Sequence, residues 1–224
     1  MSEWWTYDLR DLLLFSPQTY YRQFELHNVE WWPLPMLGLA LGFAQLLSLS
    51  RGVPRSKRLV LATLALCWVW VAWAFLWQRY SAINPAGGYF ALAFTIEALL
   101  LLWLAITHGG PRVEEVPAVR RYTGAGILLY ALLLHPLAGL LQGRSLAQAE
   151  ILGMAPDPTA LAALGILLMA CGRNFWLFAL IPLLWCLISG ATLWAMQTAD
   201  FFVSPLLALL AVASAAAGKP SIVR

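Results

Sequence analysis

Seven apolar runs, several of them about 20 residues long, constrain what this 224-residue chain can fold into. A helix needs about 20 apolar residues to cross the hydrocarbon core of a bilayer. The runs dominate the sequence: 61% of its residues are of the AVILMFWYC types and 11% are charged, against about 25% charged residues in soluble domains. Because backbone groups in lipid must be hydrogen-bonded within the segment, the runs predict an all-α, polytopic transmembrane bundle. They cover residues 33–50, 59–77, 88–108, 122–142, 158–171, 175–196 and 201–218.

The fifth run is the shortest, with 14 residues from Pro158 to Cys171. It is too short to cross a typical hydrocarbon core unaided, and only residues 172–174 separate it from the sixth run. It forms either a short span, which gives seven spans, or a re-entrant arm, which gives six.

Positive residues in the connections predict the orientation of the bundle. Residues 51–58 hold four Lys or Arg residues and residues 109–121 hold three, whereas the connections that alternate with them hold one each. Since cytoplasmic connections carry an excess of Lys and Arg, both basic connections are expected in the cytoplasm and the N-terminus outside. Seven spans also place the basic tail, residues 219–224, in the cytoplasm, so seven fits better than six.

Residues 1–32 are expected to form a separate, interfacial segment. Thr6 with Asp8 in the following turn, and Ser16 directly before Pro17, are start signals for two short helices. Tryptophan side chains favour the headgroup level of a membrane. We therefore expect amphipathic helices that form a collar along the outer interface. The tryptophans of this segment are Trp4, Trp5, Trp31 and Trp32.

Glu97 lies at the midpoint of the run from Gly88 to His108. A charge at the bilayer centre costs roughly 2.5–3.5 kcal/mol on insertion scales, so this carboxyl group is expected to be protonated, paired or facing a wet cavity. In the predicted topology His135 lies at a similar depth in the next run, where the two side chains can meet. Such a pair would hold a proton, bind a cation or position a ligand. The alternative is a structural hydrogen bond between two helices.

Trp70, Trp73 and Trp77 follow i, i+3, i+7 spacing in the outer half of their run. On an α-helix this spacing places them on one face. They would form an aromatic wall for an organic or cationic ligand. The alternative is ordinary packing together with an aromatic belt at the outer interface.

No motif in the sequence indicates a cofactor or a metal site. P-loop, HExxH and GxSxG patterns are missing, and the three histidines are too scattered for their spacing to suggest metal ligation. The cysteines lie inside apolar runs without CxxC spacing. The net charge of +3 is spread over connections rather than over one basic face, so nucleic acid is not an expected partner.

The opening stretch WWTYDLRDLLLFSPQTYYR, followed by FELHN and then WWP, resembles an uncharacterised family of bacterial multi-pass membrane proteins. The resemblance covers about the first 33 residues. It implies a bacterial inner membrane and carries no substrate or catalytic residue across. It draws attention to polar and aromatic side chains of the collar, which could cover an outer cavity as a lid. These candidates are Tyr21, Arg22, Glu25, His27 and Asn28.

These observations favour a protein that binds or moves a small solute or ion through an outward-facing cavity, with Glu97 and His135 as its polar floor. The first alternative is an accessory or assembly subunit whose collar docks a partner subunit of a membrane complex. The second is a membrane-embedded enzyme, for which the sequence offers no recognisable motif. The lipid bilayer is the expected surrounding in each case.

Overall fold

The computed structural model describes residues 15–50, 54–107, 116–171 and 174–217, and its secondary structure there is entirely helical, as the sequence predicts. Eight continuous helices and the connections between them make up these residues. Their α-helical parts are α1 (Pro17–Glu30), α2 (Leu34–Ser50), α3 (Pro54–Trp70), α4 (Gly87–Thr107), α5 (Ala118–Leu129), α6 (His135–Leu141), α7 (Pro156–Ala170), α8 (Phe175–Ala195) and α9 (Val203–Ala217). The π-helical stretch η3 (Val71–Trp77) extends α3, η6 (Tyr130–Leu134) joins α5 to α6, and η4 (Tyr80–Ala82) and η7 (Leu146–Gln148) are short 3-10 turns.

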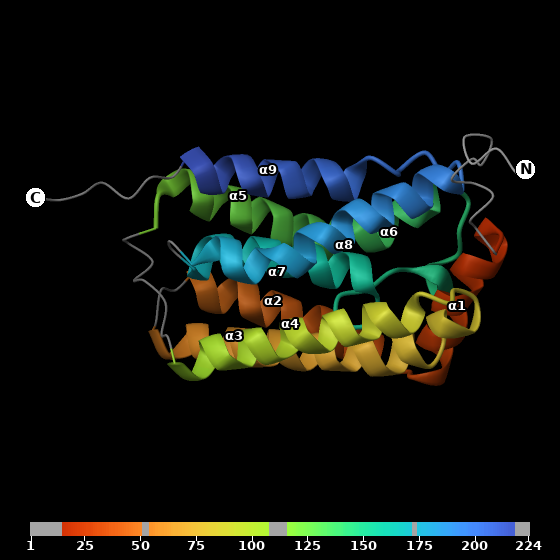
Figure 1. Ribbon diagram of the computed structural model, residues 1–224, viewed down its shortest axis with the longest axis horizontal. Helices are drawn as coiled ribbons and strands as arrows, with labels where there is room; N and C mark the ends of the chain where they lie inside the picture. The colour runs from red at the N-terminus through yellow and green to blue at the C-terminus, as the bar shows by residue number, and fades with distance from the viewer. Residues whose placement is uncertain (1–14, 51–53, 108–115, 172–173, 218–224) are drawn as a thin grey trace, which may run out of the picture.

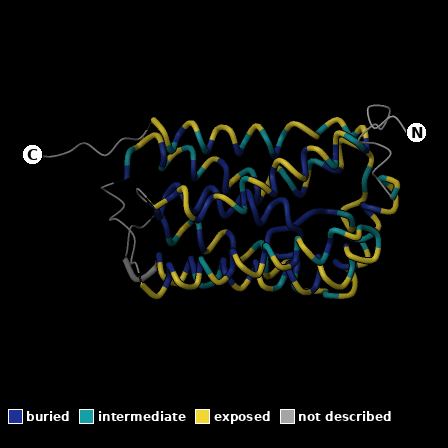
Figure 2. The backbone as a smooth tube through the Cα atoms, viewed as in Figure 1, coloured by how far each residue is buried: buried dark blue, intermediate teal, exposed yellow. Residues whose placement is uncertain are grey.

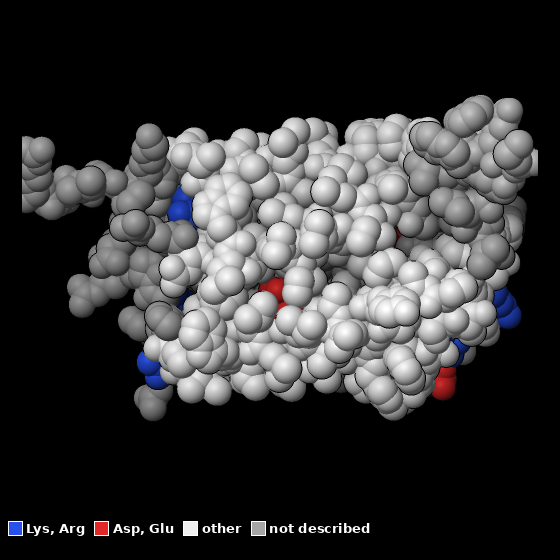
Figure 3. All heavy atoms as spheres, viewed as in Figure 1, with Lys and Arg blue, Asp and Glu red and all other residues white. Residues whose placement is uncertain are grey.

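The long helices lie side by side along the length of the molecule, and α1 lies across one end (Figure 1). Both α3 and α5 begin at the opposite end, and their first turns hold most of the Lys and Arg residues of the two basic connections. Between the two ends the visible flank is almost free of charged side chains (Figure 3). This distribution of charge suits a bundle whose flanks face hydrocarbon.

Four helical segments are long and apolar enough to cross a membrane: Lys57–Ala82, Gly87–Thr107, Ala118–Leu141 and Phe175–Ala195. A fifth candidate is the pair α1 and α2, which is bent by 91°. Helices α7 and α9 are apolar but have only 15 residues each, so seven crossings are not shown. With four or five candidate spans, the chain is a helical, multi-pass membrane protein.

Helix α7 forms the core of the bundle. All of its residues are buried, as Figure 2 shows for the dark central helix. It crosses α5 with the two backbones almost in contact, because a Cβ atom added to Gly124 would lie 2.5 Å from the carbonyl oxygen of Gly165. Small residues permit such close approach between membrane helices. The close crossing of α5 and α7 therefore depends on these two glycines.

We expect Gly124→Ala to lower the thermal stability of the detergent-purified protein by about 1–3 kcal/mol, because the added methyl group meets backbone that cannot move aside. Gly126→Ala is the matched control on the same helix, since nothing lies within 4 Å of the added Cβ atom. That control should be neutral or stabilising by up to about 1 kcal/mol. Equal melting temperatures for the two variants would contradict the close crossing of α5 and α7.

Helix α1 begins as the sequence predicts. The side chain of Ser16 accepts a hydrogen bond from the backbone N–H of Thr19, and Pro17 occupies the first turn. The helix is held against the bundle by aromatic contacts: the ring of Phe24 stacks on Phe75 at 4.7 Å, and His27 meets the same ring edge-on at 5.4 Å. The predicted helix around Thr6 lies outside the described residues.

His27 is fully buried, and neither of its ring nitrogens has a hydrogen-bond partner among the described residues. Burial, and to a lesser extent the charge of Arg79, lower the pKa of His27 to about 4. The unfolded chain has a histidine pKa of about 6.5. The unfolded state therefore takes up a proton first as the pH falls, so stability is full above about pH 6.5 and is lost between about pH 6.5 and 4.

We expect the free energy of unfolding in detergent to fall by on the order of 1–2 kcal/mol through His27 alone between about pH 7.5 and pH 5. His27→Phe keeps an aromatic ring beside Phe75 and has no proton to gain. Thermal unfolding of both proteins at the two pH values measures the difference, because other titrating groups are common to both. An identical loss of stability in the variant would show that His27 is not responsible.

Candidate functional site: a buried carboxylate cluster

The connection from α6 to α7, residues 142–155, turns back into the bundle instead of staying at its surface. Gly143 and Gly153 adopt φ values of +75° and +77°, which a residue with a Cβ atom rarely adopts. The hydroxyl group of Thr159 accepts a hydrogen bond from the N–H of Gly153 at 2.9 Å and donates one to the carbonyl of Ala155 at 2.7 Å. These bonds fix the end of the connection to the first turns of α7. As a result Glu150, in the middle of the connection, is 7% exposed.

Glu150 lies between two basic side chains. Its Oε1 atom accepts a hydrogen bond from Nη1 of Arg144 at 3.1 Å, and its Oε2 atom lies 3.6 Å from Nε2 of His135. The second guanidinium nitrogen of Arg144 lies 3.7 Å from Oδ2 of Asp200. The same guanidinium group lies over the ring of Tyr21, with Cζ of Arg144 4.0 Å from the ring centroid, which is a cation–π contact. Helix α1 therefore also contributes to the site.

Asp157 stands in the first turn of α7 and is 2% exposed. Its Oδ1 atom accepts a hydrogen bond from Nε1 of Trp185 at 2.7 Å, and its Oδ2 atom accepts one from the hydroxyl group of Ser189. Both donors come from α8. Two hydrogen bonds of this kind fix the orientation of a buried carboxyl group.

We call the five charged or titratable residues of this site the carboxylate cluster. It contains three carboxylates, one guanidinium group and one imidazole, so it is negative by one or two charges according to the state of the imidazole. Burial by itself raises the pKa of Glu150, but the hydrogen bond from Arg144 and the nearby charges of His135 and Arg144 outweigh it and lower that pKa overall. A net negative charge in an apolar interior is costly unless a proton or cation balances it. The cluster consists of His135, Arg144, Glu150, Asp157 and Asp200.

A polar pocket of about 620 Å³ adjoins the cluster. It lies between α1 and the beginning of the connection. Two of the residues that line it are Arg144, which belongs to the cluster, and Tyr21, which contacts Arg144. The exposed side chain of Arg22 lines its rim. The pocket therefore leads from the α1 end of the bundle to the guanidinium group of Arg144.

The predicted pair of Glu97 and His135 is not formed. Glu97 is fully buried, but neither of its carboxylate oxygens has a hydrogen-bond partner among the described residues. His135 is next to Glu150 instead, because the connection that folds back after α6 supplies a nearer carboxylate. The structure thus joins His135 to the cluster and places Glu97 apart from it on α4, which packs against α3 and α8.

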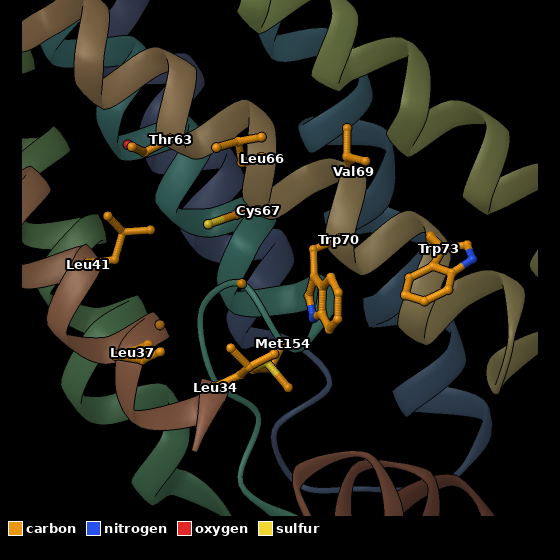
Figure 4. A pocket seen from close by; sticks show the side chains of 12 residues that line it. Leu34, Leu37, Leu41, Thr63, Leu66, Cys67, Val69, Trp70, Trp73 and Met154 are labelled. Carbon is orange, nitrogen blue, oxygen red and sulfur yellow. The ribbon is translucent and has the colours of Figure 1, made fainter. Parts of the chain in front are cut away.

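The three tryptophans do not form one continuous wall. The chain becomes π-helical at Val71, and the wider π turn changes the spacing that an α-helix would give. Trp70 and Trp73 line an apolar pocket of about 490 Å³ between α2, α3 and the connection (Figure 4). Trp77 lies instead against Gly88 at the start of α4. None of the described residues that line the pocket is charged, so its chemistry is that of a site for apolar groups.

The other collar candidates contact different parts of the structure. Asn28 donates hydrogen bonds from Nδ2 to the carbonyl groups of Ala147 at 2.9 Å and Ala149 at 2.8 Å, which attaches α1 to the connection. Glu25 pairs with Arg22 and accepts a hydrogen bond from Gln148 at 3.2 Å. His27 packs in the apolar interior. Tyr21 is the candidate that contacts the carboxylate cluster, through the guanidinium group of Arg144.

Sequence reasoning missed Arg144, Glu150, Asp157 and Asp200, because it uses the connections between apolar runs as evidence of topology only. A usable signal is present: Asp157 lies between two prolines at the entrance to an apolar run, and an acid and a base precede it in the same connection. Three charged residues, one of them next to the start of an apolar run, thus lie within 14 positions, from 144 to 157.

Comparison with known proteins supports the family resemblance. A model of a family of unknown function, DUF6064, matches residues 17–219. No curated protein and no solved structure matches the chain significantly. The match runs from the first residue of α1 past the end of α9, so it includes the whole carboxylate cluster. The resemblance seen in the opening residues is confirmed, and this helical multi-pass membrane protein belongs to DUF6064, a family of unknown function.

Proposed function

We propose that this protein binds a small cation in the carboxylate cluster and exchanges it with the outer aqueous phase. The observation that supports this most directly is the charge of the cluster: Glu150 and Asp200 share a single guanidinium group, and Asp157 is a third acidic group close to Glu150. Buried charges in membrane proteins mark ion paths or binding sites more often than they stabilise the fold. A cation bound here would balance the excess negative charge.

The polar pocket beside α1 supplies the route to the cluster. Tyr21 and Arg144 form the boundary between pocket and cluster, and Gln148 lines the pocket as well. A cation entering there would meet Arg144 first, so the guanidinium group would have to remain on Glu150 Oε1 and Asp200 while the ion reaches the remaining oxygens. In this proposal α1 acts as the lid of an outward-facing cavity, and His135 keeps its role as part of the polar floor.

We expect cations to raise the melting temperature of the wild-type protein in detergent, since a ligand at 100 times its Kd stabilises the folded state by about 2.7 kcal/mol. Asp157→Asn and Glu150→Gln should lose this response, because each keeps the side-chain shape and removes one negative charge. Glu97→Gln is the matched control, a buried carboxylate outside the cluster. The measurement is thermal unfolding across Na⁺, K⁺, Mg²⁺, Ca²⁺ and Mn²⁺.

An unchanged response in Asp157→Asn would place any cation site elsewhere. If no cation shifts the wild-type melting temperature and the same substitution only lowers stability, the cluster serves packing. The accessory-subunit alternative would then be favoured.

For the topology, the proposal is seven crossings with the N-terminus outside and the C-terminus in the cytoplasm of a bacterial cell, in the inner membrane. The segments are those predicted: an interfacial collar at 1–32, a bundle at 33–218 and a tail at 219–224. Both α3 and α5 begin at the end opposite α1, beside the two basic connections, and basic connections favour the cytoplasmic side. This arrangement supports the proposed orientation. The short helices α7 and α9 would then both cross.

Reporter fusions at residue 32 and after residue 224 test this arrangement. We expect a periplasmic reporter to be active at the first site and a cytoplasmic reporter at the second. A fusion within residues 142–149 should report the periplasm, as the cation route requires. If both terminal fusions report the same side of the membrane, the number of crossings is even and the proposed topology is wrong.

A further inference from the structure

We infer that His135, Glu150 and Asp157 bind a divalent transition-metal ion. This inference rests on the proposed function and names the class of cation. The three residues come from α6, the 142–155 connection and α7, and one ligand atom from each lies within 4.8 Å of the others.

The donor types match this class of ion. Imidazole nitrogen together with carboxylate oxygen suits Zn²⁺, Mn²⁺ and Fe²⁺, whereas Ca²⁺ and Mg²⁺ prefer all-oxygen sites. Ligands that stand about 2.1 Å from a tetrahedral ion are about 3.4 Å apart. Donor atoms within 4.8 Å of one another need to close by about an ångström or a little more, which side-chain rotation supplies.

The state of His135 is a second observation that indicates a ligand. Both ring nitrogens are shielded from solvent, and neither makes a hydrogen bond among the described residues. Nε2 stands 3.6 Å from Glu150 Oε2, which is beyond hydrogen-bonding distance. Buried polar atoms are nearly always paired. A metal ion between the two side chains would give Nε2 a direct ligand bond in place of the 3.6 Å approach to Glu150.

The surrounding groups leave the required oxygens available. Arg144 occupies Oε1 of Glu150, so Oε2 remains on the side of His135. Trp185 and Ser189 each take one lone pair of Asp157 and fix its orientation, as the outer partners of metal-binding carboxylates do.

The charge of the cluster favours a divalent ion over a monovalent one. With neutral His135, the three carboxylates and Arg144 sum to two negative charges, which one divalent ion cancels. Three protein ligands also leave one coordination position open, as in zinc sites that exchange water or substrate. The pocket of about 620 Å³ would supply that position with solvent.

The test uses the full-length protein, purified in detergent, treated with a chelator and then dialysed against Zn²⁺ or Co²⁺ alone. We expect one metal ion per chain by elemental analysis, and a Co²⁺ absorption spectrum typical of nitrogen and oxygen ligands. His135→Phe should weaken binding by at least about 100-fold, because it removes a direct ligand. His27→Phe is the matched control, the same substitution at a second buried histidine, and should bind as the wild type does.

Trp185→Phe provides a second variant that keeps all three ligands. It removes the indole donor to Asp157 and should weaken binding about 10-fold to 100-fold. Its Co²⁺ spectrum should keep the wild-type band positions, because all three ligands remain. A variant whose metal site has lost its structure would shift or lose these bands.

Equal Zn²⁺ affinity in the wild type and His135→Phe would overturn the inference. So would a response to Na⁺ or Ca²⁺ that depends on Asp157 while Zn²⁺ and Co²⁺ bind no more tightly than these ions, although the proposed function would then stand. If no cation binds at all, both the inference and the proposed function fail.

Discussion

The arrangement of charge inside an apolar bundle is the constraint on which the rest of this structure depends. Moving a single ion out of water costs several kcal/mol even after the protein relaxes, so the charged groups must compensate one another. Here Arg144 compensates Glu150 and Asp200, while α8 supplies two donors to Asp157. These groups come from segments far apart in the chain. The cluster therefore fixes how the 142–155 connection, α7 and α8 meet.

The length of α7 explains why the cluster is buried. Its 15 residues make a helix about 22 Å long, which is shorter than a hydrocarbon core of about 30 Å. The connection before Pro156 fills the missing depth, and it is not helical from 149 to 151. Irregular backbone is tolerated at membrane depth where protein surrounds it or where it lines a cavity. The 142–155 connection and α7 thus together span the depth that a single longer helix would otherwise cross.

The sequence predicts the parts of this structure that depend on local chemistry. Apolar run lengths predict the helices, and Ser16 before Pro17 predicts the start of α1, because both signals act within a few residues. The cluster depends on a backbone reversal at Gly143 and Gly153 that brings Glu150 beside His135, and no periodicity encodes that pairing. The separation of Trp77 from Trp70 and Trp73 has a related reason. A π-helical stretch changes the register, and spacing rules assume an α-helix.

Glu97 and Asp157 show why burial alone does not identify a binding site. Both carboxyl groups are almost completely removed from solvent. Glu97 has no hydrogen-bond donor among the described residues, so nothing there stabilises a negative charge. Asp157 receives donors from Trp185 and Ser189 and has an imidazole and a second carboxylate close by. A cation requires an oriented carboxylate, and donors of this kind fix that orientation. The location of such donors, which a sequence does not reveal, therefore distinguishes the cluster from the isolated acid at the centre of α4.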